Sequence, residues 1–176
     1  MKLKEIISES KKLRVFDFDD VLVKTDSNVY VTHLDGSTTK LTPGEYAVYK
    51  PKRGDRFDYS DFDEVKNPRM IKAVTEVLRK MAAKGDKRGV YILTARGNAR
   101  PIEQYIRDIG IGNVKVIALD NSDPEAKADW VERQVQNKGY DDVYFIDDAQ
   151  PNVKAVKRRL QGLGVKHNVQ LMKGTK

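Results

Sequence analysis

Short apolar runs alternate with stretches of helical periodicity over most of the chain, and this pattern predicts its secondary structure. Strands are predicted at the apolar runs, which are residues 13–18, 89–93, 114–118, 142–146 and 165–171. Helices are predicted where apolar residues recur every three or four positions, near residues 3–13, 68–84, 99–109, 124–138 and 151–161. Short apolar strands that alternate with helices indicate a parallel sheet covered on both faces. We therefore predict an α/β, doubly wound (Rossmann-like) fold.

Turn residues set the predicted helix ends. Asn67-Pro68 is predicted to begin a helix that stops at Gly85, with an inner face made of Met70 or Ile71, Val74, Val77, Leu78 and Met81. Asp123-Pro124 is predicted to cap the helix that ends before Gly139. The first helix is predicted from the spacing of four apolar residues, Leu3, Ile6, Ile7 and Leu13.

Residues 24–66 interrupt this alternation. Asp35-Gly36 predicts a hairpin whose flanks are residues 29–31 and 38–41, and an irregular charged stretch follows it. The segment holds six of the chain's aromatic residues, which are Tyr30, Tyr46, Tyr49, Phe57, Tyr59 and Phe62. We expect an insertion with a small core of its own, within a single domain that spans residues 1–176.

Composition narrows the class of protein. Hydrophobic residues make up 39% of the 176 residues and charged residues 34%, which is typical of a globular chain. The sequence has no long apolar run and no apolar secretory leader, so no membrane association is expected. It has no cysteine, which excludes disulfides, thiolate zinc sites and cysteine nucleophiles. We expect a cytoplasmic protein.

The formal net charge of +7 is concentrated in one segment. Residues 149–176 contain seven basic residues and no acidic one, whereas residues 1–148 are balanced. Lys154, Lys157 and Arg158 lie at helical spacing there and could contact a phosphate backbone; the alternative is a solvated helix face. His33 and His167 have no metal-ligand spacing and are assigned no role.

Carboxylates gather where the predicted strands end. Asp17, Asp19 and Asp20 follow the first strand, Thr94 ends the second, and Asp147 and Asp148 end the fourth. In a doubly wound sheet these ends form one ligand-binding edge. Several carboxylates at one edge repel one another unless a cation neutralises them, and Mg²⁺ prefers such oxygen ligands. The sequence therefore predicts a Mg²⁺ site.

The same segments resemble the motifs of a known superfamily. VFDFDDVL, which contains Asp17 and Asp19, resembles the first motif of the haloacid dehalogenase (HAD) superfamily of phosphohydrolases. YILT resembles the second motif, Lys127 matches the third, and VYFIDD resembles the fourth. The order and spacing agree over residues 13–160. The chain also resembles uncharacterised HAD-like proteins of phage genomes, a resemblance that supplies no substrate.

The resemblance implies a role for each motif residue. Asp17 would attack phosphorus and form an aspartyl-phosphate, and Asp19 would act as general acid and then general base. Mg²⁺ would be held by Asp17, the backbone carbonyl of Asp19, Asp147 and Asp148, the last directly or through water. Thr94 and Lys127 would contact the transferring phosphoryl group. An Asp at position 19 favours a phosphatase over the dehalogenase and ATPase branches.

Some assignments stay open within this resemblance. Lys115 competes with Lys127 for the third motif, and Asp20 stands beside the site where the superfamily usually has Gly. Val21 stands where Thr is common. Arg96 and Asn98, just past Thr94, could bind substrate or turn the chain, and Asp20 is grouped with them as a candidate substrate-binding residue.

Residues 24–66 occupy the place of a small cap, which would leave the site open. The expected partner is a phosphorylated substrate, and a nucleotide or nucleic-acid terminal phosphate is favoured over a sugar phosphate. The aromatic residues of the insertion could stack on a base or form its core. The alternatives to a phosphatase are a nucleic-acid-binding module or a structural protein on the same scaffold, with little or no catalysis. The oligomeric state stays open.

Overall fold

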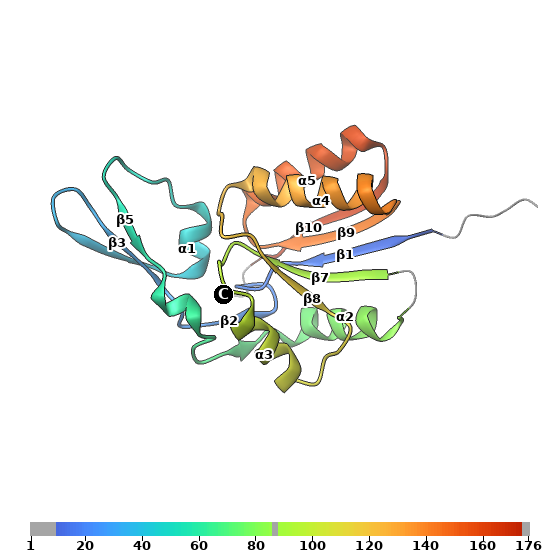
Figure 1. The fold of residues 1–176 in the computed structure, drawn as a ribbon, viewed down its shortest axis with the longest axis horizontal. Coiled ribbons are helices and arrows are strands. Elements are labelled where there is room, and N and C mark those ends of the chain that lie inside the picture. The colour runs from blue at the N-terminus through green and yellow to red at the C-terminus, as the bar shows by residue number, and fades with distance from the viewer. Residues whose placement is uncertain (1–9, 86–87, 174–176) are drawn as a thin grey trace, which may run out of the picture.

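A computed structural model describes residues 10–85 and 88–173, and within it five parallel strands form the central sheet (Figure 1). Their order is β10-β9-β1-β7-β8, which places β1 at the centre. The bounds are Lys12–Phe16 for β1, Arg88–Thr94 for β7, Lys115–Ala118 for β8, Asp142–Asp147 for β9 and Lys166–Leu171 for β10. Each coincides with a predicted strand to within a few residues, and the predicted α/β parallel architecture is confirmed.

Helices cover both faces of this sheet. In Figure 1, α4 (Pro124–Lys138) and α5 (Gln150–Leu163) lie on one face, and α2 (Lys72–Ala83) and α3 (Arg100–Asp108) lie on the other. Two apolar clusters fill the layers, one between the sheet and α4 and α5, the other between the sheet and α2 and α3. The predicted caps are present: Asp123 accepts a hydrogen bond from the Glu125 N–H, and Gly139 ends α4 with a φ of +69°.

The predicted start of the second helix is wrong by a few residues. Arg69–Met70 forms the short strand β6, which pairs with β2 (Val23–Lys24), and α2 begins only at Lys72. The Ile71 N–H donates to the Leu22 carbonyl at 2.8 Å, so the chain remains extended beside β2 before the helix starts. Val77, predicted to face the core, is 38% exposed. Thr75 is buried on the inner face instead, where its hydroxyl donates to the same Leu22 carbonyl at 3.2 Å.

The opening of the chain differs in part from the prediction. Residues 1–9 lie outside the described part, and with them Leu3, Ile6 and Ile7 of the predicted first helix. Leu13, assigned to that helix and to the first strand, is a buried residue of β1.

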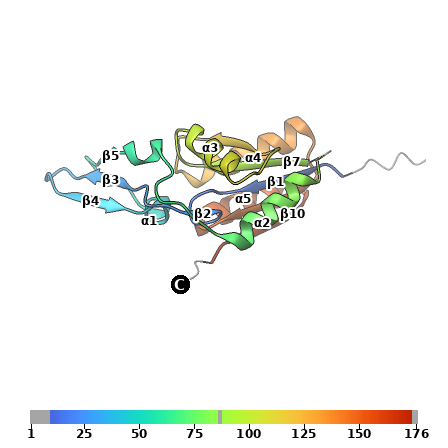
Figure 2. The same cartoon turned by 90° about the horizontal axis from the view of Figure 1, so that it is seen from below.

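The insertion forms a second, smaller sheet. Its strands are β3 (Val29–Thr32), β4 (Thr38–Leu41) and β5 (Arg56–Asp58), in the order β4-β3-β5. The β3–β4 hairpin is the predicted one, and the stretch expected to be irregular also contains α1 (Pro43–Val48) and the 3₁₀ turn η1 (Ser60–Asp63). Val29, Val31, Leu41 and Phe62 make its core, against which Tyr46, Tyr49 and Phe57 pack. Figure 2 shows this sheet at one end of the molecule, beyond the carboxyl ends of the parallel strands.

Among the helices of the described ranges, none combines the length and apolar character that a membrane span requires.

Candidate functional site

Two carboxylates and one lysine meet at the carboxyl edge of the central sheet. The Asp17 N–H donates to the Ile146 carbonyl at 3.0 Å, which extends the β1–β9 pairing and brings Asp17 beside Asp147. Lys127 reaches this pair from α4, with its Nζ 2.9 Å from Asp17 Oδ1 and 2.7 Å from Asp147 Oδ2. Lys115 lies exposed at the amino end of β8, so Lys127 is the lysine that contacts the cluster.

A third carboxylate completes a candidate metal site. Asp17, Asp147 and Asp148 each offer an oxygen, and these atoms lie within 4.8 Å of one another. Burial raises the pKa of Asp17 well above its usual value, although Lys127 opposes this. Burial and the charge of Asp147 raise the pKa of Asp148 to about 6. Three buried or half-buried carboxylates against one ammonium leave an excess of negative charge, which a hard divalent cation such as Mg²⁺ would neutralise.

Lys127 stays charged in this setting. Burial lowers the pKa of its amine, but the charges of Asp147 and Asp17, with the two hydrogen bonds, outweigh burial and leave the pKa above its usual value. Its ammonium thus remains a fixed positive charge within hydrogen-bond distance of Asp17, the position a transferring phosphoryl group would require.

A residue that the sequence reasoning missed orients Asp147. Asn152, on the first turns of α5, points its amide Nδ2 at both oxygens of Asp147, at 3.1 Å each. The Ala149 N–H donates to Asp147 Oδ1 at 2.8 Å. Asn152 is buried, and the signal that could have found it is a polar residue on the face of α5 that also carries Ala155 and Val156.

Asp19 is held by Arg96 in a two-point ion pair. Arg96 Nε lies 2.8 Å from Asp19 Oδ2, and Nη2 lies 2.7 Å from Oδ1. The remaining donors of Arg96 reach the Glu64 carbonyl at 3.0 Å and the Thr25 hydroxyl at 3.3 Å. The guanidinium also lies over the Phe62 ring, 4.4 Å from its centroid. Arg96, predicted either to bind substrate or to turn the chain, is 2% exposed and donates four hydrogen bonds within the protein.

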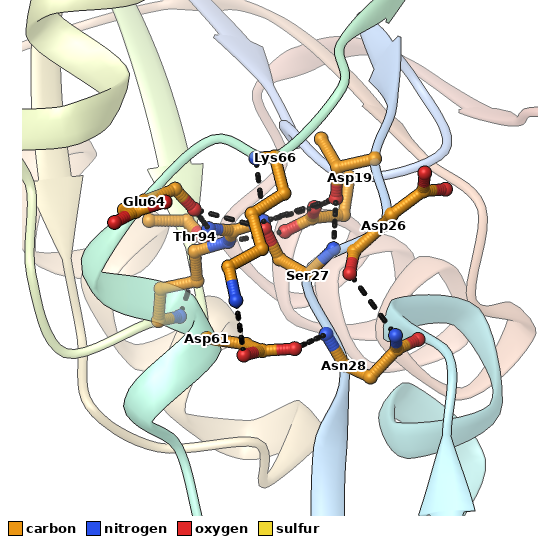
Figure 3. Close-up of polar contacts among 10 residues, drawn as sticks. Asp19, Asp26, Ser27, Asn28, Asp61, Glu64, Lys66 and Thr94 are labelled. Atoms are coloured by element: carbon orange, nitrogen blue, oxygen red, sulfur yellow. Dashed lines mark hydrogen bonds and ion pairs between the residues drawn. The ribbon is translucent and has the colours of Figure 1, made fainter.

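The two connections between the insertion and the central sheet are tied together next to this pair (Figure 3). The Ser27 hydroxyl donates to the Glu64 carbonyl at 2.8 Å and accepts from the Lys66 N–H at 3.2 Å. The Asn28 N–H donates to Asp61 Oδ2 at 3.1 Å, and the Asp61 carboxylate also pairs with the Lys66 ammonium. Residues 25–28 and 61–66 thus form one junction, and Arg96 contacts both of these segments, through Thr25 and Glu64.

The other predicted residues lie around the same edge. Thr94 is buried, and its hydroxyl accepts from the Arg96 N–H at 3.1 Å. Asn98 donates to Asp63 of the insertion at 3.3 Å and accepts from the Arg100 N–H, so it also shapes the start of α3.

Asp20 contacts the insertion as well. It has a left-handed φ of +61°, a conformation that Asp tolerates better than most residues and that explains why glycine suits the position. Its carboxylate pairs with Lys24 at 3.6 Å. A Cβ on Gly44 of α1 would lie 2.8 Å from Asp20 Oδ2, so this carboxylate packs directly against the insertion.

Two hollows flank the site. A cavity of about 750 Å³ is bordered by Asp20 and Asp148 together with the cations Lys24, Lys40 and Arg69. A smaller cavity of about 230 Å³ lies between the insertion and the loops after β7 and β8. Both cavities therefore adjoin the candidate site, the larger one at Asp148 and Asp20 and the smaller one at Arg96.

The basic segment is partly neutralised by α4. Arg158 pairs with Glu125 at 2.6 Å, and Arg159 contacts Glu125, Asp129 and Glu132. Lys154 and Lys157 remain exposed on α5. Of the three basic residues predicted to contact a phosphate backbone or to form a solvated helix face, Arg158 is thus paired with a carboxylate, whereas Lys154 and Lys157 are exposed.

The histidines that were assigned no role have structural contacts. His33 lies between Asp55, at 2.7 Å from Nδ1, and the Thr39 hydroxyl, at 2.8 Å from Nε2. These contacts fasten the hairpin to the loop before β5. His167 bonds to the Val165 carbonyl at 2.8 Å.

No protein-family model matches this chain, and no curated protein sequence matches it either.

Proposed function

We propose that this protein is a Mg²⁺-dependent phosphomonoesterase of the HAD type that works through an aspartyl-phosphate on Asp17. The observation that carries this proposal is the buried cluster in which Lys127 bridges Asp17 and Asp147, with Asp148 within 4.8 Å. The cluster combines a nucleophile, a fixed cation and a set of oxygen ligands at the ligand-binding edge of an α/β sheet.

Asp17 is the nucleophile in this proposal. Its carboxylate forms a bond to phosphorus while the bond between phosphorus and the leaving oxygen breaks, and Asp19 gives that oxygen a proton. Water then attacks the phosphorus, Asp19 takes its proton, and inorganic phosphate leaves with Asp17 restored. Lys127 and the Thr94 hydroxyl stabilise the charge on the phosphoryl oxygens.

Asp17, Asp147 and Asp148 would hold the Mg²⁺ ion, and the Asp19 carbonyl would complete the protein ligands. The donor set fits, because it consists of oxygens alone and carries more negative charge than Lys127 balances. When bound, the ion would shield the attacking carboxylate from the anionic substrate and draw charge from the phosphoryl oxygens.

Asp19 must leave Arg96, at least in part, to transfer a proton. Both of its oxygens accept hydrogen bonds from the guanidinium in the present arrangement. A substrate phosphate is a dianion that competes with Asp19 for the same planar donor. We infer that an arriving phosphate draws Arg96 away from Asp19 and frees the carboxylate for acid–base chemistry.

Residues 24–66 are the cap in this proposal. The small sheet lies beyond the carboxyl edge of the central sheet, and its Asp63 and Glu64 contact Asn98 and Arg96. In this proposal the phosphate enters through the 750 Å³ cavity, which reaches Asp148 and has Lys24, Lys40 and Arg69 on its border together with Asp20 and Asp26. The substrate we favour is a nucleotide or a nucleic-acid terminal phosphate.

The test is phosphate release in the presence of Mg²⁺ from an aryl phosphate, mononucleotides, sugar phosphates and 5′- and 3′-phosphorylated oligonucleotides. Wild type is compared with Asp17→Asn and Asp19→Asn. Asp108→Asn, an exposed residue of α3, is the matched control. We expect turnover in wild type and in the control, and its loss in the two site variants. Turnover that survives Asp17→Asn contradicts the proposal.

A nucleic-acid-binding or structural role without catalysis makes a different prediction. Binding of DNA or RNA that falls steeply with salt and survives Asp17→Asn, together with no phosphate release, would favour the binding role. The absence of both would favour the structural one. The buried Lys127 bridge weighs against both, because neither role requires carboxylates gathered around a buried ammonium.

A further inference from the structure

The cavity of about 230 Å³ lies between the insertion and the sheet edge. Ala95, Arg96, Gly97 and Asn98 of the loop after β7 form its floor with Asp120 of the loop after β8, and the insertion supplies Tyr46, Tyr59, Phe62 and Asp63. Arg96 borders this cavity and pairs with Asp19 through the same side chain. A group held here would therefore be adjacent to the proposed acid–base residue.

One wall of this cavity is aromatic. Tyr46 packs edge-on against Tyr59, with ring centroids 5.6 Å apart, and its hydroxyl donates to the Tyr59 hydroxyl at 3.1 Å. Phe62 lies behind them and is buried, whereas Tyr59 is 42% exposed. Burial, the bond to Tyr46 and the charge of Asp120 raise the pKa of Tyr59, so its hydroxyl stays neutral. The wall thus offers a flat surface with a polar edge.

Another part of the cavity lining carries hydrogen-bond acceptors. Asp120 has a left-handed φ of +52°, and its N–H donates to the Arg96 carbonyl at 3.2 Å. A Cβ on Gly97 would lie 2.6 Å from Asp120 Oδ1, so a glycine is needed for the carboxylate to sit there. Asp63 adds a second carboxylate and Asn98 an amide.

The charges of the cavity define what it can bind. Among the described residues that line it, Arg96 is the one cation, and its charge is paired with Asp19. Asp63, which accepts from Asn98, and Asp120 give the cavity lining a net negative charge. An additional phosphate would be repelled here, whereas a neutral group rich in N–H and O–H donors would find acceptors.

We propose that this cavity binds the nucleoside part of a nucleoside monophosphate, with the base against Tyr59 and donor groups toward Asp63 and Asp120. The inference rests on the proposed function, because it places the phosphate at Asp17. A base offers the flat face that the aromatic wall fits, and base amino groups and sugar hydroxyls offer the donors. The acidic wall and the small volume favour a free mononucleotide over an oligonucleotide end, whose further phosphates would be repelled.

The first experiment compares kcat/KM for nucleoside monophosphates, ribose 5-phosphate and an aryl phosphate, in wild type and in Asp120→Asn, Tyr59→Ala and Tyr59→Phe. Asn also tolerates a left-handed φ, so Asp120→Asn keeps the loop conformation. We expect Asp120→Asn and Tyr59→Ala to lower kcat/KM for nucleoside monophosphates by about ten- to a hundredfold. The aryl phosphate should change little, and Tyr59→Phe should retain most of the preference. Asp108→Asn serves again as the exposed control.

A second experiment separates this inference from the proposed chemistry. Binding of unphosphorylated nucleosides to wild type is followed by ligand-observed NMR, with Asp17→Asn and Asp120→Asn as variants. We expect binding that survives Asp17→Asn and weakens in Asp120→Asn, even if no phosphate is released from any substrate. Equal kcat/KM for ribose 5-phosphate and nucleotides, or nucleoside binding unchanged by Asp120→Asn and by Tyr59→Ala, would overturn the inference.

Discussion

Arg96 and Asp19 hold each other through two hydrogen bonds, of 2.8 and 2.7 Å, although they lie far apart in the sequence. Arg96 is the residue two positions after Thr94, and Asp19 is the residue two positions after Asp17. The pair therefore links the ends of β7 and β1. Because Arg96 also bonds to the Glu64 carbonyl, it links the insertion to the proposed acid–base residue, and Thr25 of the insertion donates to Asp19 Oδ1 as well, at 3.4 Å.

This pair predicts a large effect of removing the guanidinium. Arg96→Ala leaves the half-buried Asp19 without the guanidinium and removes one of the two donors to the Glu64 carbonyl, the other being the Ser27 hydroxyl. We expect a loss of about 3 kcal/mol in the free energy of unfolding, measured by urea denaturation. Arg158→Ala, which removes an exposed partner of Glu125, should change it by less than about 1 kcal/mol.

A double-mutant cycle assigns that loss to the pair. If Asp19 and Arg96 interact as described, Arg96→Ala in the Asp19→Asn background should be less destabilising than Arg96→Ala alone, by about 1 to 3 kcal/mol. Additive effects of the two substitutions would show that the pair contributes nothing beyond packing.

Mg²⁺ is predicted to stabilise the folded protein through Asp147. A ligand that binds only the folded state at a hundred times its Kd adds about 2.7 kcal/mol, which raises Tm by several degrees. We expect this rise in wild type, its reversal by EDTA, and its loss in Asp147→Asn. An equal rise with Mg²⁺ in Asp147→Asn would place the ion elsewhere, and Asp108→Asn should respond as wild type does.

Asn152 is predicted to position Asp147 for the ion. Asn152→Ala removes two hydrogen bonds of 3.1 Å, so the carboxylate loses part of what orients it. We expect Mg²⁺ affinity, followed by calorimetry, to fall by about tenfold or more. If Asn152 acts by orienting Asp147, Asn152→Asp should weaken Mg²⁺ binding at least as much as Asn152→Ala does. If negative charge at this position matters more than orientation, Asn152→Asp should weaken binding less than Asn152→Ala does.

The stability of the metal-free protein is predicted to fall as pH rises from about 4 to about 6. Burial raises the pKa of Asp148 to about 6 and that of Asp17 above its usual value of 3.8, so the folded state retains protons that the unfolded state loses. The stabilisation from these two protonated carboxyl groups is fully present below their pKa in the unfolded state. It is lost as the pH rises through their pKa in the folded state.

Urea denaturation in EDTA at several pH values measures this slope. Asp148→Asn should flatten it without abolishing it, because Asp17 still contributes. Asp55 does not confound the result, since hydrogen bonding to the Lys52 N–H and to His33 lowers its pKa to about 2 and moves its contribution below pH 4. A slope that is identical in wild type and Asp148→Asn would contradict the predicted burial of this carboxylate.

The sequence predicts the central sheet well, for a physical reason. Strands such as β9 are buried on both faces, so their apolar runs stand out, and caps such as Asp123 and Gly139 mark helix ends through local chemistry. The start of α2 was misplaced because β6 is held by pairing with β2, a contact between distant segments that local periodicity cannot reveal.

The sequence predicts which carboxylates meet at the candidate site, but it does not predict the side chains that hold them, Arg96 and Asn152. Strand ends in a parallel sheet converge, and this brings Asp17 and Asp147 together whatever the side-chain details. The engagement of Arg96 by Asp19 depends on how residues 25–28 and 61–66 pack, which no spacing encodes. Asn152 was missed for a similar reason, because its contact with Asp147 depends on how the start of α5 lies against the end of β9.

The most direct test of the central claim is to trap the phosphoryl group on the protein. Substrate is mixed with Mg²⁺ and protein, the reaction is stopped in acid, and the peptide that contains Asp17 is examined by mass spectrometry. The account predicts a phosphorylated Asp17 in wild type and none in Asp17→Asn. Phosphate release from wild type with no phosphoryl group on Asp17 under any of these conditions, or undiminished turnover in Asp17→Asn, would contradict it.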